Sequence, residues 1–202
     1  MVLADLPQGI RENYEVHEWK HAVAILRNDF PAELADIVAV LDEFRLYRSE
    51  IMMPGGGKSL IASRLDRGLY ERGWVKKSFR TQTTVDDDVL DSATHEVDCY
   101  RNRIALAVEW NNKDPFFGRD LNNFRQLFDL RAISIGVIIT RSDELQAIFD
   151  SLGLDARGKP IRLKYGMSTT HSRSCSRGSR PAALGVAQCS CSALRVICMW
   201  RT

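Results

Sequence analysis

The segment ISIGVIIT, residues 133–140, constrains the fold of this chain more than any other stretch. It is an almost continuous run of apolar, mostly β-branched residues, whereas a strand with one face in solvent alternates apolar and polar residues. A continuous run of this length is typical of a strand that is buried on both faces. The segment therefore predicts a sheet that other elements cover on both sides.

The flanking segments alternate between helical and strand patterns. Apolar residues recur at helical spacing in some of them and at every second position in others. We expect helices over residues 14–29, 31–44, 58–72, 119–130 and 142–153, and strands over 75–85, 95–100 and 103–110. This order predicts an α/β fold with a mixed central β-sheet flanked by helices.

Length and charge limit the function classes. A chain of 202 residues can form one domain with a substantial core, and a net charge of +2 means that a nucleic-acid surface must be a local basic patch. The sequence contains no run of 18 apolar residues, and its start lacks the pattern of a secretory signal. We therefore expect no membrane span and a cytoplasmic location.

Residues 171–202 differ in composition from the rest of the chain. They contain five Arg, six Ser and four Cys but no Asp, Glu or Lys. Such a break is typical of a tail that is read in a shifted frame or is disordered. A free back-translation in a frame displaced by two nucleotides gives a strand-like run, VLVLGI, which favours the first alternative. We therefore expect a folded domain over 1–170 and an atypical tail over 171–202.

The segment HEWKH, residues 17–21, has the H-E-x-x-H pattern of zinc hydrolases. On a helix, His17 and His21 would face one metal ion, with Glu18 as general base. A catalytic zinc site also needs a third protein ligand, and the residues after His21 offer none at a distinctive spacing. The alternative is an amphipathic helix with both histidines on its solvated flank, and this interpretation is favoured.

The segment PGGGKS, residues 54–59, is similar to the end of a phosphate-binding loop. The complete motif requires glycine at position 52, which is Met52, and a buried strand before the loop. Neither condition is met. We expect a loop that leads into the helix over 58–72.

Two carboxylates mark the candidate site. Asp98 ends one expected strand and Glu109 lies on the next, and a tight turn through Arg101, Asn102 and Arg103 would bring both to one edge of the sheet. Two carboxylates with water molecules suit Mg²⁺, which takes oxygen ligands and keeps much of its hydration. The alternative is an exposed hairpin with solvated charges.

The segments VEWNNKDPFFGRDLNNFR and ISIGVIITR, together with Asp98, carry a resemblance. They resemble the PD-(D/E)xK nuclease core, most specifically type II restriction endonucleases of the BglII and BstYI group. The resemblance covers residues from about 15 to 170. It implies a restriction-endonuclease-like domain that acts as a homodimer, uses Mg²⁺ and hydrolyses both strands of double-stranded DNA at a short palindromic site, in a restriction-modification system.

Position 107 departs from this family's pattern. Residues two apart on a strand share a face, so Ala107 and Glu109 point one way. In one alignment Ala107 takes the place of the metal-binding acid and Glu109 the third motif position; in the other, Glu109 is the acid and Asn111 the third position. In the first alignment the protein has lost a metal ligand. We favour this alignment because it requires the shorter hairpin between the two strands. For the upstream residue that often completes such sites, Glu71 is the candidate.

Basic residues near this edge are the candidates for DNA contact. Lys76, Lys77 and Arg80 form a local cluster, and Arg119 begins a polar helix face. Such residues position a duplex through its phosphates without reading its sequence. Each group of charges is equally compatible with a solvated surface.

Three functions follow from these patterns. The first is a magnesium-dependent endonuclease, with catalytic residues Asp98, Glu109 and Asn111 and with Asp98 and Glu109 on the metal; Ala107 would impair it. The second is a DNA-binding dimer that does not cleave. The third is a zinc peptidase that uses His17 and His21.

Overall fold

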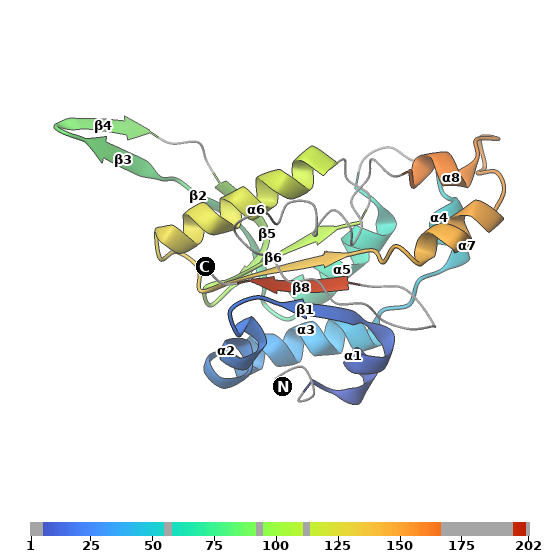
Figure 1. Ribbon diagram of the computed structural model, residues 1–202, viewed down its shortest axis with the longest axis horizontal. Coiled ribbons are helices and arrows are strands. Elements are labelled where there is room, and N and C mark those ends of the chain that lie inside the picture. Colours follow the sequence, from blue (N-terminus) through green and yellow to red (C-terminus); the bar gives the residue numbers. More distant parts are fainter. Residues whose placement is uncertain (1–5, 55–57, 92–94, 111–113, 167–195, 201–202) are drawn as a thin grey trace.

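A six-stranded mixed sheet forms the centre of the protein in a computed structural model (Figure 1). The structure describes residues 6–54, 58–91, 95–110, 114–166 and 196–200, without the side chains of 83, 114–117 and 196–200. The strands of this sheet are β1 (Glu15–Glu18), β2 (Val75–Phe79), β5 (His95–Arg101), β6 (Ile104–Glu109), β7 (Ile135–Thr140) and β8 (Val196–Trp200). Their order across the sheet is β1-β8-β7-β6-β5-β2. The predicted α/β fold with a mixed, helix-flanked sheet is confirmed.

The sheet mixes parallel and antiparallel pairs. β6 and β7 run parallel, with Ala107 opposite Ile138, because helix α6 (Asp114–Asp129) connects them. β2, β5 and β6 form an antiparallel meander. β8 pairs antiparallel with β7 and parallel with β1.

Two apolar clusters cover the two faces of the sheet. The larger one packs Leu106 and Val108 of β6 against α3 (Pro31–Glu43) and α5 (Leu60–Tyr70). The remaining elements on this side are α1 (Gln8–Asn13), α2 (Ala22–Asp29), α4 (Arg48–Met52), α7 (Leu145–Ser151) and α8 (Ile161–Lys164). The smaller cluster packs Ala105 and Ala107 against Phe124 of α6. The predicted alternation along β6 is therefore confirmed.

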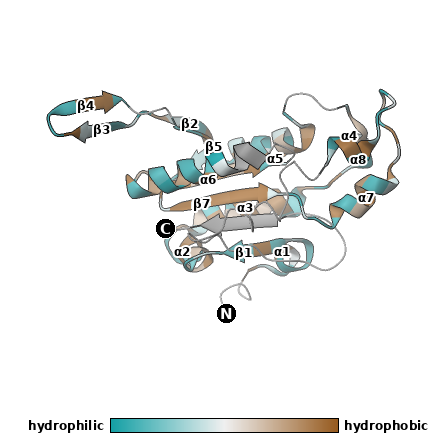
Figure 2. Ribbon diagram, turned by 45° about the horizontal axis from the view of Figure 1, so that its top comes forward, coloured by the Kyte–Doolittle hydropathy of each residue, from teal (hydrophilic) through white to brown (hydrophobic). Residues whose placement is uncertain are grey.

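Strand β7 is buried along its whole length, as its sequence predicts, and is hydrophobic over most of that length (Figure 2). Gly136 lies under the ring of Phe124, so that a Cβ atom there would be 2.5 Å from Phe124 Cδ2. The glycine therefore lets α6 pack closely on the sheet.

The helix expected over residues 14–29 is wrong in its first half. Residues Glu15–Glu18 form strand β1, and α2 begins only at Ala22. Lys20 and His21 between them have φ values of 51° and 59°, which a helix does not contain. The helices expected over 31–44 and 58–72 correspond to α3 and α5, and Ser59 caps α5 by accepting a hydrogen bond from the Ala62 N–H at 3.1 Å.

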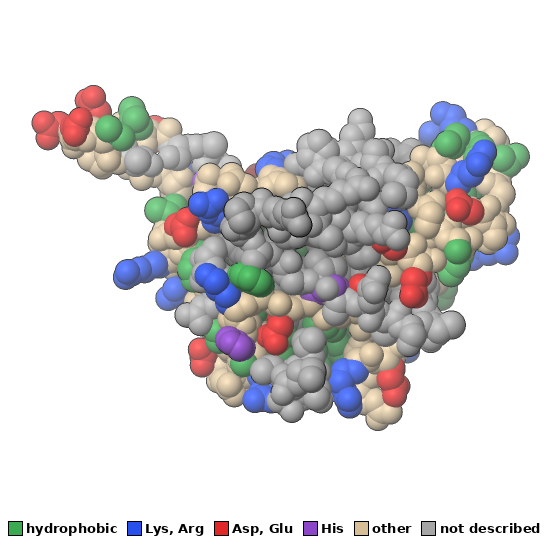
Figure 3. Space-filling view, in the orientation of Figure 1, with side chains coloured by type: hydrophobic (Ala, Val, Ile, Leu, Met, Phe, Trp, Pro, Cys, Tyr) green, Lys and Arg blue, Asp and Glu red, His purple; other side chains and the backbone are tan. Residues whose placement is uncertain are grey.

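A two-stranded arm of β3 (Gln82–Val85) and β4 (Asp88–Asp91) projects from the body (Figure 1). We expected one continuous strand over 75–85; the chain instead leaves the central sheet after Phe79. Acidic side chains gather at the tip of the arm (Figure 3). Asp86 there has a φ of 54°, which forms the turn between the two strands.

The boundary predicted at residue 170 stays a prediction, because most of the tail lies outside the described residues. Strand β8, from Val196 to Trp200, fills the position between β1 and β7. In the described part of the chain, no helix has the length and apolarity needed to span a membrane.

Candidate active site

The β5–β6 hairpin builds the candidate site. Arg101 pairs with Ile104, and the two turn residues between them, Asn102 and Arg103, both have positive φ values. Tight hairpins use such a turn because its twist matches that of the strands. Asp98 therefore lies on one strand of a hairpin and Ala107 on the other, as the sequence predicted.

A bulge in β5 distinguishes Asp98 from its neighbours. Tyr100 pairs with Val75 of β2 and Val97 pairs with Lys77, so Asp98 and Cys99 together oppose the single residue Lys76. A bulge of this kind changes the direction of a side chain at the edge of a sheet. Cys99 packs into the larger cluster, whereas Asp98 lines a pocket on the α6 side.

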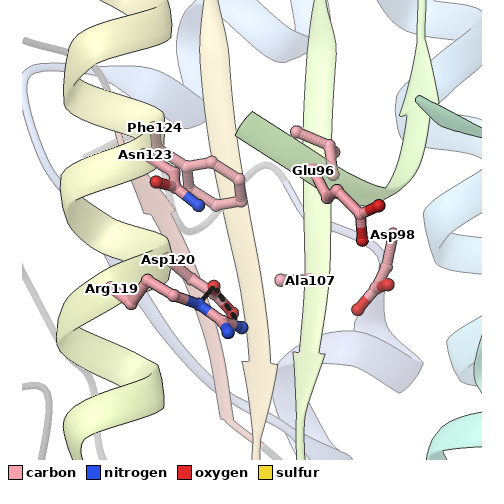
Figure 4. Close-up of a pocket in the computed structure, with 8 residues that line it drawn as sticks. Glu96, Asp98, Ala107, Arg119, Asp120, Asn123 and Phe124 are labelled. Atoms are coloured by element: carbon pink, nitrogen blue, oxygen red, sulfur yellow. Dashed lines mark hydrogen bonds and ion pairs between the residues drawn. The ribbon is translucent and has the colours of Figure 1, made fainter. Parts of the chain in front are cut away.

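This pocket has a volume of about 170 Å³ and contains Ala107 on its floor (Figure 4). Glu96 and Asp98 come from β5 on one side, and Arg119, Asp120 and Asn123 from α6 on the other. Arg119 donates from Nε to Asp120 Oδ1 at 3.1 Å, and the same carboxylate oxygen lies 3.1 Å from Arg119 Nη2. The pocket thus joins three carboxylates and one guanidinium around a methyl group.

Position 107, not 109, lies next to Asp98 along the hairpin. Cys99 pairs with Leu106, so Asp98 and Ala107 occupy the next positions on their strands. Glu109 is two residues further on, is buried, and is not among the described residues that line the pocket. Asn111 lies outside the described residues.

The chain matches the family of restriction endonucleases BglII/BglIII over residues 14–181. It belongs to this family. Searches of curated proteins and of solved structures found no match. The match spans most of the chain, including the β5–β6 hairpin, α6 and β7, and it extends past the boundary expected at residue 170.

Membership of this restriction endonuclease family makes the pocket the candidate nuclease site. A metal site of such an enzyme needs oxygen donors. Asp98 supplies one carboxylate, but the facing position 107 supplies only a methyl group. Among the described residues, no three His, Cys, Asp or Glu side chains form a group that could hold a metal ion. In the described part of the chain, Asp98 therefore lacks the facing carboxylate that would complete a magnesium site with it.

A second acid that the sequence did not indicate lies behind Asp98. Asp66 of α5 is 2 % exposed, pairs with Lys58, and accepts a hydrogen bond from Cys99 Sγ at 3.5 Å. Burial raises the pKa of Asp66, against the lowering effect of Lys58. Tyr70 on the same helix donates to the backbone carbonyl of Asp98 at 2.9 Å.

Glu71, the upstream candidate from the sequence, is exposed at the end of α5. Asp66 is five residues earlier and points into the protein interior. The helical spacing of Ile61, Ala62, Leu65 and Leu69 could have placed Asp66 on the buried face of α5, but it carries no signal that this face lies beside Asp98.

The basic residues lie at the same edge but have partners. Lys76 forms an ion pair with Glu96 at 2.9 Å, and Lys77 Nζ lies 4.1 Å from the centre of the Tyr100 ring. Arg119 lines the pocket itself. Arg80 is exposed between β2 and the arm.

The zinc interpretation fails on geometry. His17 is buried on β1, where its Nε2 lies 3.1 Å from Glu15 Oε1, and His21 is exposed in the left-handed turn before α2. The two histidines therefore do not share a helix face, which the H-E-x-x-H site requires.

Proposed function

We propose that this member of the family is a type II site-specific deoxyribonuclease, a homodimer of a restriction-modification system that hydrolyses double-stranded DNA at a short palindromic site with Mg²⁺. We propose further that Ala107 impairs its cleavage, while its DNA binding is retained. The observation that carries this proposal is the position of Ala107 beside Asp98 in a hairpin of a restriction endonuclease family member.

The roles of the site residues follow from this proposal. Asp98 is the remaining strand carboxylate toward the metal, and Asp66 is the upstream acid in place of Glu71. Glu109 takes the third motif position, so Asn111 is not needed there. Arg119, held by Asp120, supplies positive charge at the pocket.

A DNA-binding dimer that does not cleave is the second candidate. The missing carboxylate at position 107 favours it. The two candidates share DNA binding and differ only in residual hydrolysis.

DNA binding is tested by the salt dependence of affinity. Arg80 is exposed, and among the described residues no ion pair involves its side chain. We expect Arg80→Ala to weaken binding to duplex DNA and to lower the slope of log K against log salt by about 0.9, the value for one phosphate contact. Lys159→Ala, which removes an exposed charge beside α8, is the matched control and should leave the slope unchanged. Equal slopes in all three proteins would contradict the contact, and no binding by the unaltered chain would contradict the proposed function.

A further inference from the structure

A second cavity lies at the opposite end of strand β6 from the candidate active site. Its volume is about 290 Å³, and it lies where α2 and α6 end and where β6 and β7 begin. These four chain segments lie together at one end of the sheet (Figure 1). The residues that matter here are Asp29, Phe30, Arg103, Phe128, Arg131 and Ser134.

The cavity is distinct from the nuclease pocket. The two share no described lining residue. Arg103 precedes Ala107 by four positions on an extended strand, which separates their Cα atoms by roughly 13 Å. A ligand in this cavity would therefore not occupy the nuclease pocket.

Both arginines of the cavity stand where glycine is usual. Arg103 is the second residue of the tight β5–β6 turn and has a φ of 69°. Arg131 follows α6 and has a φ of 58°. At this helix end, the Arg131 N–H donates a hydrogen bond to the Phe128 carbonyl and the Ala132 N–H donates one to the Leu127 carbonyl, both at 2.8 Å. Hairpin turns and helix ends of these types favour glycine because a side chain disfavours positive φ. Two unrelated positions with positive φ thus place arginines in the lining of one cavity.

The charged groups of the cavity are available for a ligand. In the described part of the chain, no ion pair joins Arg103, Arg131 or Asp29 to another side chain. Two guanidinium groups suit a phosphate, which accepts several hydrogen bonds at once. Phe30 and Phe128 supply apolar walls against which a planar ring can pack, and the Asp29 carboxylate accepts hydrogen bonds from amino or hydroxyl groups.

We propose that this cavity binds a nucleoside monophosphate, with the phosphate on Arg103 and Arg131 and the base against the phenylalanines. The volume is just below the range for small-molecule sites, which suits one mononucleotide and not a longer strand. Ser134 also lines the cavity.

The test is calorimetric titration of the full chain with AMP. Arg103→Gly and Arg131→Gly each remove a guanidinium group and place glycine where the backbone favours it, so both variants should melt at the same temperature as the parent or higher. We expect each to weaken AMP binding about tenfold or more, as for loss of a charge-assisted hydrogen bond. Arg157→Ala, which removes an exposed arginine before α8, is the control and should bind AMP like the parent.

Adenosine and inorganic phosphate separate the two halves of the proposed ligand, and each should bind more weakly than AMP. Equal binding of AMP to the parent and to both glycine variants would overturn the proposal. So would phosphate binding as tight as AMP binding, which would reduce the site to an anion site. A loss of affinity for duplex DNA in both glycine variants would also overturn the proposal, because it would assign the two arginines to the DNA-binding surface of the protein.

Discussion

Glu15 and His17 of β1 form a buried pair, with 3 % and 5 % of their side chains exposed. Burial raises the pKa of Glu15 from 4.5 to about 7, and burial lowers the pKa of His17 from 6.5 to about 3. Glu15 therefore contributes stability below pH 4.5 that is lost as the pH rises to 7. His17 contributes stability above pH 6.5 that is lost as the pH falls to 3.

Between pH 4.5 and 6.5 these two contributions change in opposite directions. The folded and the unfolded pair each hold one proton there, so the pair adds no slope to the unfolding free energy. Glu15→Gln removes the carboxyl group that titrates and leaves the pH dependence of His17 unopposed. The glutamine keeps a hydrogen-bonding partner for Ser142. We expect the stability of this variant to rise relative to the parent by about 2 to 3 kcal/mol from pH 4.5 to 6.5. Urea unfolding at several pH values measures this; parallel curves for the two proteins would contradict the assigned pKa shifts.

Among the helices and strands, the local sequence was sufficient to predict an element wherever that element contacts its neighbours in the chain. The β5–β6 hairpin, α6 and β7 were predicted because their periodicity and turn residues agree with their final contacts. Residues Glu15–Glu18 were predicted as helix because β1 pairs with β8, which is far away in the sequence. Asp66 was missed for a similar reason, since its importance depends on how α5 packs on β5.

The contact between α6 and β7 yields a stability prediction. A methyl group at position 136 would meet the ring of Phe124, which is 2 % exposed and cannot move into solvent. We expect Gly136→Ala to lower the unfolding free energy by about 1 to 3 kcal/mol, as overpacking of a core does.

Gly118 in α6 provides the matched control. A Cβ atom there would contact nothing within 4 Å, so Gly118→Ala should stabilise the helix by about 0.5 to 1 kcal/mol. Chemical denaturation of both variants compares them directly. A neutral or stabilising effect of Gly136→Ala would show that α6 does not pack on β7 as described.

Across the protein, the two sites lie at different positions along strand β6. The candidate nuclease pocket lies on the α6 side beside Asp98, and the arginine-lined cavity lies at the end where β6 begins. The acidic arm of β3 and β4 projects away from the body of the protein (Figures 1 and 3). DNA contact is therefore expected from the basic edge of β2 and from α6.

We propose that this restriction endonuclease lacks one carboxylate at position 107. Incubating plasmid DNA with Ala107→Glu and with the parent, in Mg²⁺ or EDTA, tests it directly; Ala107→Gln is the control for side-chain size. We expect Ala107→Glu to produce discrete fragments in Mg²⁺ about a hundredfold faster than the parent, the scale of one lost electrostatic group in an active site. Neither Ala107→Gln in Mg²⁺ nor any of the proteins in EDTA should reach this cleavage rate. If Ala107→Glu leaves plasmid intact while binding DNA and folding like the parent, position 107 is not the missing ligand.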